Sequence, residues 1–245
     1  MSLPVHLVSS LAGARAGTAV EVTGDEAHHA VAVRRLREGE QVVLTDGAGV
    51  RAVGTVASTG KRVFAVGLES VERVPRPEPS VTVVQALPKG DRGELAVEVL
   101  TEVGVDRIVP WAAARSVAVW RGERAAKSHA KWAATAREAA KQARRAWHPT
   151  VAPLASTAEV AALVGAADLA LVLHEDATTG LAALDVPAGS LLVVVGPEGG
   201  LTEDEVAAFE AAGAHAVRLG AEVLRTSTAG LAAVAAVLSR TDRWA

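Results

Sequence analysis

The chain of 245 residues contains no cysteine, which excludes disulfide bonds, thiolate metal sites and cysteine nucleophiles. Its seven histidines show no H-x-x-x-H spacing, and the adjacent pair His28–His29 would point to opposite faces of any strand. The sequence therefore predicts no metal site.

Long apolar runs are also absent, although 50% of the residues are hydrophobic. No stretch approaches the roughly 18 apolar residues that span a bilayer. The opening MSLPVHLVSSLAGARAG has no basic segment before its apolar residues, so a signal peptide is not expected. We therefore expect a cytoplasmic protein.

Three common ligand motifs are missing around the glycine-rich stretch GPEGG at 196–200. Its glycines do not follow G-x-G-x-x-G, and it lacks the Lys-Ser/Thr end of a P-loop. No serine lies in G-x-S-x-G either. The sequence thus carries no sign of a dinucleotide fingerprint, a P-loop or an α/β-hydrolase elbow.

Two patterns of hydrophobicity divide the chain. Residues 17–74 alternate short Val- and Thr-rich runs with Gly-containing turns, which predicts a small antiparallel barrel. The stretch VERVPRPEPS at 71–80 contains three prolines and is interpreted as a linker. We expect a β domain over 1–74 and an α/β domain over 75–245.

Strands and helices alternate in the second domain, which predicts a parallel sheet covered on both faces. The expected strands are 81–87, 107–111, 169–175, 191–196 and 215–220. The expected helices are 92–105, 123–147, 157–165, 202–212 and 226–239.

A buried strand at 191–195 runs directly into the turn Gly196–Leu201. Thr202 and Glu205 then form a capping-box pattern that opens a helix. The loops 173–180, 196–202 and 219–230 all follow strands, and ligands of open α/β sheets bind beyond the carboxyl ends of the strands. The three loops are therefore candidate ligand loops.

Two stretches carry a family resemblance: VVVGPEGGLTEDEV, and VRLGAEVLRTSTAGLAAV about twenty residues later. Together they resemble the C-terminal signature of SPOUT methyltransferases, and more narrowly the ribosomal RNA small subunit methyltransferase E family. The stretches 28–47, 85–111 and 137–151 are similar to other parts of that family in the same order.

The resemblance implies a PUA-like β-barrel joined to a SPOUT α/β domain whose C-terminal segment threads a deep trefoil knot. It further implies a homodimer that binds S-adenosyl-L-methionine and methylates N3 of a uridine in small-subunit (16S) ribosomal RNA. The cofactor residues it implies are Leu173, His174, Gly196, Glu198, Gly199, Gly200, Leu219, Gly220, Leu224, Arg225 and Thr226.

Arg225 and Glu198 are the catalytic candidates. The Arg225 guanidinium could stabilise negative charge developing on the uracil, or it could form a salt bridge with Glu198 or a neighbouring chain. Glu198 could orient a cofactor amine, accept a proton or cap the turn. His174 suits a core position nearly as well as a ligand contact. Ser227 stands where the family usually has Glu, and Gly230 replaces a usual Ala, so no base is assigned at 227.

Charge is unevenly distributed, because residues 121–145 carry eight Lys or Arg against two Glu (8 − 2 = +6) in a chain of net charge −3. A helical wheel of 123–147 places a basic face opposite an apolar one, which indicates a phosphate track or a solvated face. A second basic cluster lies in the first domain, where we expect backbone and shape recognition of RNA. The predicted RNA-binding residues are Arg34, Arg35, Arg37, Lys127, Lys131, Arg137, Lys141 and Arg144.

Two other functions are compatible with these residues. One is a catalytically silent RNA-binding factor, although such a factor has no need of intact glycine loops. The other is a SPOUT enzyme with another RNA target or atom.

Overall fold

The computed structural model describes residues 3–244, and these form two compact units. The first unit comprises the chain up to 76 together with residues 140–148. The second comprises 77–139 and 149 onward. The chain therefore leaves the first unit, builds part of the second and returns once before completing it.

The first unit contains one mixed sheet of five strands in the order β1-β3-β4-β5-β2. Its strands are β1 Val5–Leu7, β2 Ala19–Thr23, β3 Gln41–Thr45, β4 Val50–Gly60 and β5 Val63–Arg73. The pairs along β3, β4, β5 and β2 are antiparallel, but β1 pairs with β3 in parallel. Because β1 and β2 are the two edges of this sheet, the described strands form a half-barrel where the sequence suggested an antiparallel barrel.

A short helical segment packs into the half-barrel core. It consists of α1 Gly24–His28 and the π-helical turn η1 His29–Val33, so His28 and His29 lie on helices rather than on a strand. Alternate residues of the strands pack with Ala27 and Ala30 into one buried cluster. Within it, Phe64 contacts the buried His6 ring edge to face at 5.2 Å.

The helix α3 Glu123–Gln142 ends five residues before its predicted end at 147. Its last turn and the residues after it, 140–148, belong to the first unit. Arg144 adopts a left-handed φ of 54°, and the chain then pairs with the turn at Gly47–Gly49. The Trp147 indole Nε1 donates to the carbonyl of Val74 at 3.0 Å. These contacts between residues distant in sequence stop the helix, although its periodicity continues.

The second unit contains a parallel six-stranded sheet in the order β11-β9-β10-β6-β7-β8. Its strands are β6 Ser80–Ala86, β7 Arg107–Trp111, β8 Thr150–Val151, β9 Leu169–Leu173, β10 Ser190–Val195 and β11 His215–Val217. The remaining helices are α2 Arg92–Val103, α4 Thr157–Gly165, α5 Glu203–Ala211, α6 Thr226–Leu238 and the short 3-10 turns η2 Leu181–Ala183 and η3 Asp242–Trp244. The predicted strands and helices of this domain are present, but α3 ends before 147 and the last strand ends at Val217 rather than at 220. The strand β8 and the two 3-10 turns were not predicted.

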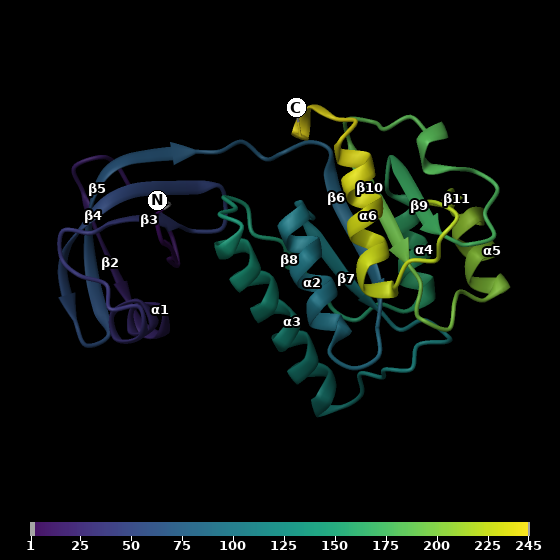
Figure 1. Cartoon of the computed structure of the whole chain (residues 1–245), viewed down its shortest axis with the longest axis horizontal. Coiled ribbons are helices and arrows are strands. Elements are labelled where there is room, and N and C mark those ends of the chain that lie inside the picture. The colour runs from purple at the N-terminus through teal and green to yellow at the C-terminus, as the bar shows by residue number, and fades with distance from the viewer. Residues whose placement is uncertain (1–2, 245) are drawn as a thin grey trace. The chain divides into compact units, whose positions relative to one another are not determined.

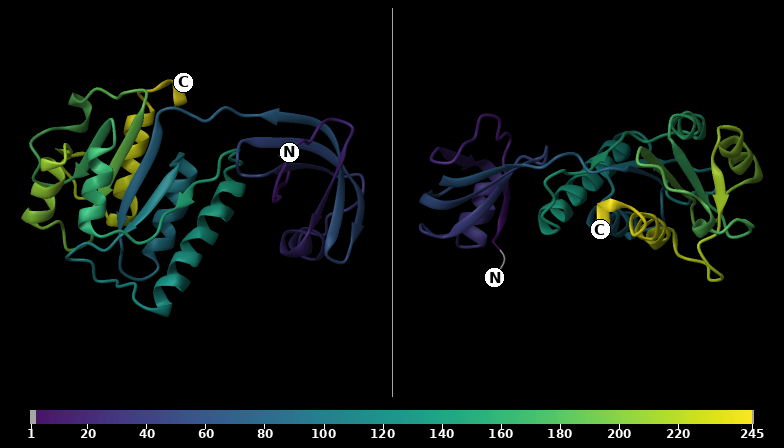
Figure 2. Two further views of the ribbon diagram at one scale, coloured as in Figure 1. Left: turned by 180° about the vertical axis from the view of Figure 1, so that it is seen from behind. Right: turned by 90° about the horizontal axis from the view of Figure 1, so that it is seen from above.

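Helices cover both faces of this sheet (Figures 1 and 2). Alternate strand residues such as Val83 and Val193 pack against α2, α3 and α6. Their neighbours Val84 and Val194 pack against α4 and α5 on the other face. Burial on both faces explains why these strands are continuously apolar in sequence. No described helix is long and apolar enough to cross a membrane.

Candidate functional site

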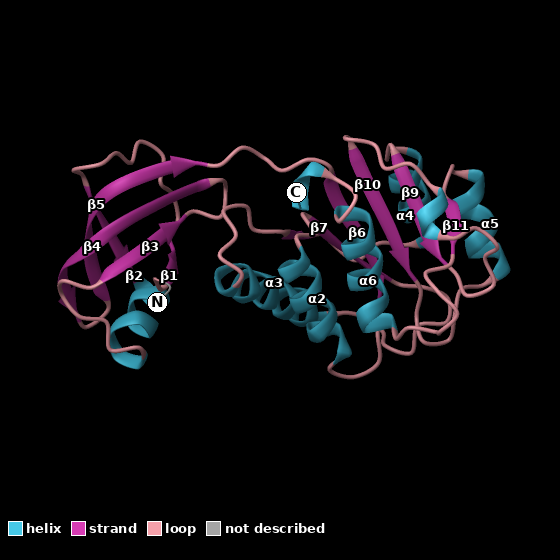
Figure 3. Cartoon of the chain, turned by 45° about the horizontal axis from the view of Figure 1, so that its top comes forward, coloured by secondary structure: helices cyan, strands magenta, loops and turns pink. Residues whose placement is uncertain are grey.

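The candidate ligand loops emerge from the carboxyl ends of β9, β10 and β11, which are adjacent strands of the parallel sheet. Figure 3 shows these loops gathered beyond the arrowheads of the strands. The loops after β6 and β7 leave the same edge and reach the loop after β10 through hydrogen bonds. The three loops that the sequence singled out therefore share one edge with two loops that it did not.

The loop after β10 is a tight, well-braced turn. The Gly200 N–H donates to the carbonyl of Pro197 at 2.9 Å, and Gly200 has a φ of +72°, which favours glycine. The predicted capping box is confirmed: Thr202 Oγ1 accepts from the Glu205 N–H at 3.2 Å, and Glu205 Oε2 accepts from the Thr202 N–H at 2.9 Å. The buried Glu205 also accepts from the Ala114 N–H at 2.8 Å.

Glu198 contacts the loop after β6. Its Oε1 accepts from the Lys89 N–H at 3.1 Å and lies 3.9 Å from Arg92 Nη1. No ion pair joins Glu198 to Arg225 among residues 3–244, so the salt bridge weighed from the sequence is not formed within this chain. The carboxylate instead ties the glycine turn to the segment at 88–92.

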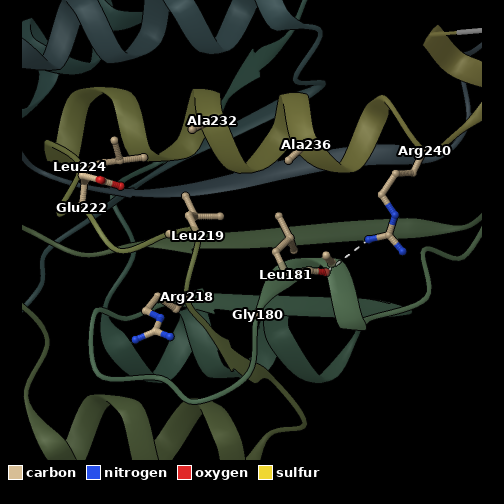
Figure 4. A pocket seen from close by; sticks show the side chains of 11 residues that line it. Gly180, Leu181, Arg218, Leu219, Glu222, Leu224, Ala232, Ala236 and Arg240 are labelled. Carbon is tan, nitrogen blue, oxygen red and sulfur yellow. Dashed lines mark hydrogen bonds between the residues drawn. The ribbon is translucent and has the colours of Figure 1, made fainter.

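The loop after β11 lines a pocket of about 410 Å³ beside α6 (Figure 4). Leu219 and Leu181 project between the strands and the helix, with Ala232 and Ala236 on the helix side. The Arg240 Nη1 donates to the carbonyl of Leu181 at 3.3 Å at one end of the pocket. The lining residues are Gly180, Leu181, Ala182, Arg218, Leu219, Gly220, Glu222, Leu224, Ala232, Ala236 and Arg240.

Of the predicted cofactor residues, Leu219, Gly220 and Leu224 line this pocket. Leu173 ends β9, and the next residue, His174, donates its backbone N–H to Val217 at 3.0 Å. The His174 Nδ1 accepts from the Asp176 N–H at 3.2 Å, so the half-buried ring stabilises the start of its own loop.

The predicted cofactor residues Arg225 and Thr226 lie at the start of α6. Arg225 is the exposed N-cap residue, and its carbonyl accepts from the N–H groups of Thr228 and Ala229. Thr226 and Ser227 are buried behind it. The buried Gln85 of β6 donates its side-chain amide to the carbonyl of Thr226 at 3.3 Å, a contact that the sequence did not indicate.

The basic residues differ in their surroundings. Arg34, Arg35 and Arg37 are exposed in the segment after η1. On α3, Lys131 pairs with Glu94 at 2.9 Å. Lys141 pairs with Glu26 at 2.8 Å and is only 12% exposed, so it belongs to the interior of the first unit rather than to a solvent-facing track. Arg137 lies 3.6 Å from Glu138, and Lys127 and Arg144 are exposed.

The pocket suits a small organic ligand better than a metal ion. Its volume lies in the usual range for such ligands, and apolar side chains dominate its walls. No group of three or more metal-ligating side chains is present in the described part of the chain. The apolar walls fit the organic part of a small ligand, and the turn Gly196–Leu201 is not among the residues that line the pocket.

Comparison with known proteins agrees with this architecture. An RNA methyltransferase domain family matches residues 76–238, and an RNA methyltransferase PUA domain family matches residues 22–66. The half-barrel followed by the parallel sheet and its carboxyl-edge loops defines a SPOUT-class RNA methyltransferase with a PUA domain.

Two relatives that are similar over nearly their whole length show to which family this chain belongs. The chain is 48% identical over 233 residues to ribosomal RNA small subunit methyltransferase E of Mycobacterium bovis, spanning 93% of this chain and 89% of that protein. It is 33% identical over 230 residues to the Bacillus subtilis protein of the same name, spanning 90% of each. The chain belongs to the ribosomal RNA small subunit methyltransferase E family.

A solved structure supports this assignment. The crystal structure of a ribosomal RNA small subunit methyltransferase E from Neisseria gonorrhoeae, bound to S-adenosyl methionine, is 27% identical. It superposes with a TM-score of 0.86 and covers 98% of both chains. The predicted fold class and family are thus confirmed, whereas the threading of the knot stays a prediction.

Proposed function

We propose that this chain uses S-adenosyl-L-methionine to methylate N3 of a uridine in 16S ribosomal RNA. Family membership over nearly the whole chain is the observation that carries this proposal. The pocket beside α6 supports it because its walls are apolar, and the turn Gly196–Leu201 supports it because it follows β10 at the usual ligand edge of a parallel sheet.

The cofactor, when bound, supplies an activated methyl group on a sulfonium. Leu219 and Leu224 would hold its apolar parts, and the turn Gly196–Leu201 would approach it with backbone groups. Arg225 is the candidate for dispersing negative charge as uracil N3 loses its proton, because a guanidinium is a fixed cationic donor. Glu198 would act mainly by fixing the turn, since its carboxylate already contacts the Lys89 N–H.

RNA would contact exposed basic side chains of both units. Arg34, Arg35 and Arg37 supply one set, and Lys127, Lys131, Arg137 and Arg144 supply another. The burial of Lys141 against Glu26 removes it from this proposal. Action on ribosomal RNA implies a cytoplasmic site of action.

We also keep the homodimer as a proposal. Val117 and Val119 in the loop after β7, and Val223 in the loop after β11, are 57–75% exposed, and a second copy that covered them would remove apolar surface from water. Sedimentation equilibrium would contradict this proposal if the chain remained a monomer at micromolar concentration.

The test is incubation of unmethylated 16S ribosomal RNA, free or in small subunits, with the chain and the cofactor. Nucleoside mass spectrometry is expected to detect N3-methyluridine, and reverse transcription should stop at one position because N3 lies on the pairing edge. Arg225→Ala should lower turnover by about 10²- to 10³-fold while RNA affinity stays within a few-fold. Methylation of a different atom or no methylation would contradict the proposal, and full activity of Arg225→Ala would contradict the role of that residue.

A further inference from the structure

The loop after β7 reaches the glycine turn through Arg115, which the sequence did not single out. The Arg115 Nη1 donates to the carbonyl of Leu201 at 3.1 Å and to that of Gly199 at 3.3 Å. One guanidinium nitrogen therefore bridges both ends of the sharpest part of the turn. Charge-assisted hydrogen bonds of this kind are stronger than those between neutral groups.

These bonds complete the bracing of two peptide groups in the turn. In the peptide from Gly199 to Gly200, the carbonyl accepts from Arg115 and the N–H donates to Pro197. In the peptide from Leu201 to Thr202, the carbonyl accepts from Arg115 and the N–H donates to Glu205. The peptide between them, from Gly200 to Leu201, makes no such bond to the described residues.

Packing supports the same connection. A Cβ on Gly199 would lie 3.0 Å from the Cβ of Arg115 and 3.1 Å from its carbonyl oxygen, so the two loops touch closely. The adjacent Ala114 N–H donates to the buried Glu205 at 2.8 Å. The segment at 114–115 thus donates hydrogen bonds both to the turn, through the Arg115 side chain, and to the helix that follows it, through the Ala114 backbone.

We infer that Arg115 is a positioning residue, which holds the Gly199–Leu201 turn in the shape that binds the cofactor. This inference rests on the proposed function. Without Arg115, two carbonyls lose their partner and the two braced peptides can rotate, so the unbonded peptide between them is no longer fixed for the ligand. The expected cost falls on cofactor affinity rather than on RNA binding or folding.

The experiment titrates S-adenosyl-L-methionine by calorimetry into the wild type, Arg115→Met, Arg115→Lys and the control Arg107→Met. Arg107 is an exposed arginine that begins β7, at the opposite end of this strand from the loop that carries Arg115. We expect the Kd to rise about tenfold in Arg115→Met, to rise less in Arg115→Lys, and to stay unchanged in Arg107→Met. Steady-state methylation should show a higher KM for the cofactor, an unchanged KM for RNA and a kcat within about threefold of the wild type.

The possible outcomes separate the two proposals. Binding by Arg115→Met within twofold of the wild type would overturn the inference while leaving the proposed function intact. A Kd that rises equally in Arg107→Met, or that rises together with a lowered melting temperature of Arg115→Met, would overturn the inference as well, because the effect would then be structural. A wild type that does not bind the cofactor would overturn the proposed function and the inference with it.

Discussion

At the scale of the residue, Glu26 is the clearest case of a side chain whose chemistry is set by its partners. Burial raises its pKa, but hydrogen bonds from His6 and Lys141 and the charge of Lys141 lower the pKa to about 2. The carboxylate lies 2.8 Å from Lys141 Nζ and 3.2 Å from His6 Nδ1. An ion pair of this kind holds the returning segment at 140–148 on the half-barrel.

Acid should weaken the first unit through this carboxylate. A pKa lowered from 4.5 to about 2 contributes about 3 kcal/mol of stability, fully present above pH 4.5 and lost as the pH falls toward 2. Glu26→Gln should therefore lower the free energy of unfolding at pH 7 and flatten its dependence on pH below 4.5. Urea unfolding from pH 7 to pH 2.5 measures both, and equal acid slopes in the two proteins would contradict this account.

At the scale of the element, α3 belongs to both units and presents different chemistry along its length. Trp132 packs in the core of the second unit, where it meets Trp120 edge to face at 5.0 Å. Ala136 and Ala140 are buried, as the helical wheel predicts. Lys127 and Arg137 face solvent, whereas Lys141 at the last turn is held by Glu26. The basic face proposed for RNA is therefore shorter than the charge pattern alone indicates.

Charge reversal on α3 should weaken RNA binding. In Lys127→Glu with Arg137→Glu, the loss of phosphate contacts should lower affinity for 16S ribosomal RNA and reduce the slope of log K against log salt by roughly 1 to 2. The control is Arg107→Glu, at the first residue of β7, which is the end of the strand away from the ligand loops. Filter binding between 50 and 200 mM salt gives the slopes, and an unchanged slope would return this face to an ordinary solvated surface.

At the scale of the whole molecule, the sequence predicts those structural features that depend on local periodicity. The strands of the parallel sheet, the capping box at Thr202 and the placing of three loops at one sheet edge all follow from patterns within about twenty residues. The family resemblance correctly predicted the PUA-like unit and the methyltransferase unit.

The remaining features depend on contacts between distant segments. Trp147 ends α3 early by packing on the half-barrel, Arg115 reaches a loop 84 residues away, and Glu198 accepts from Lys89 across 109 residues. No periodicity encodes such partners, because each is chosen by the tertiary structure. The sequence could therefore predict the loops of the site but not the residues that brace them.

The most direct test of the central claim, that the turn Gly196–Leu201 carries the cofactor, is a calorimetric titration with S-adenosyl-L-methionine of the wild type, Gly199→Val and Gly67→Val. A side chain at 199 is crowded by Arg115, whereas the nearest atom to a Cβ at Gly67 is 3.9 Å away. We expect binding by the wild type and Gly67→Val, and at least a tenfold loss of affinity in Gly199→Val. Equal binding by all three proteins, or binding by none, would contradict the claim.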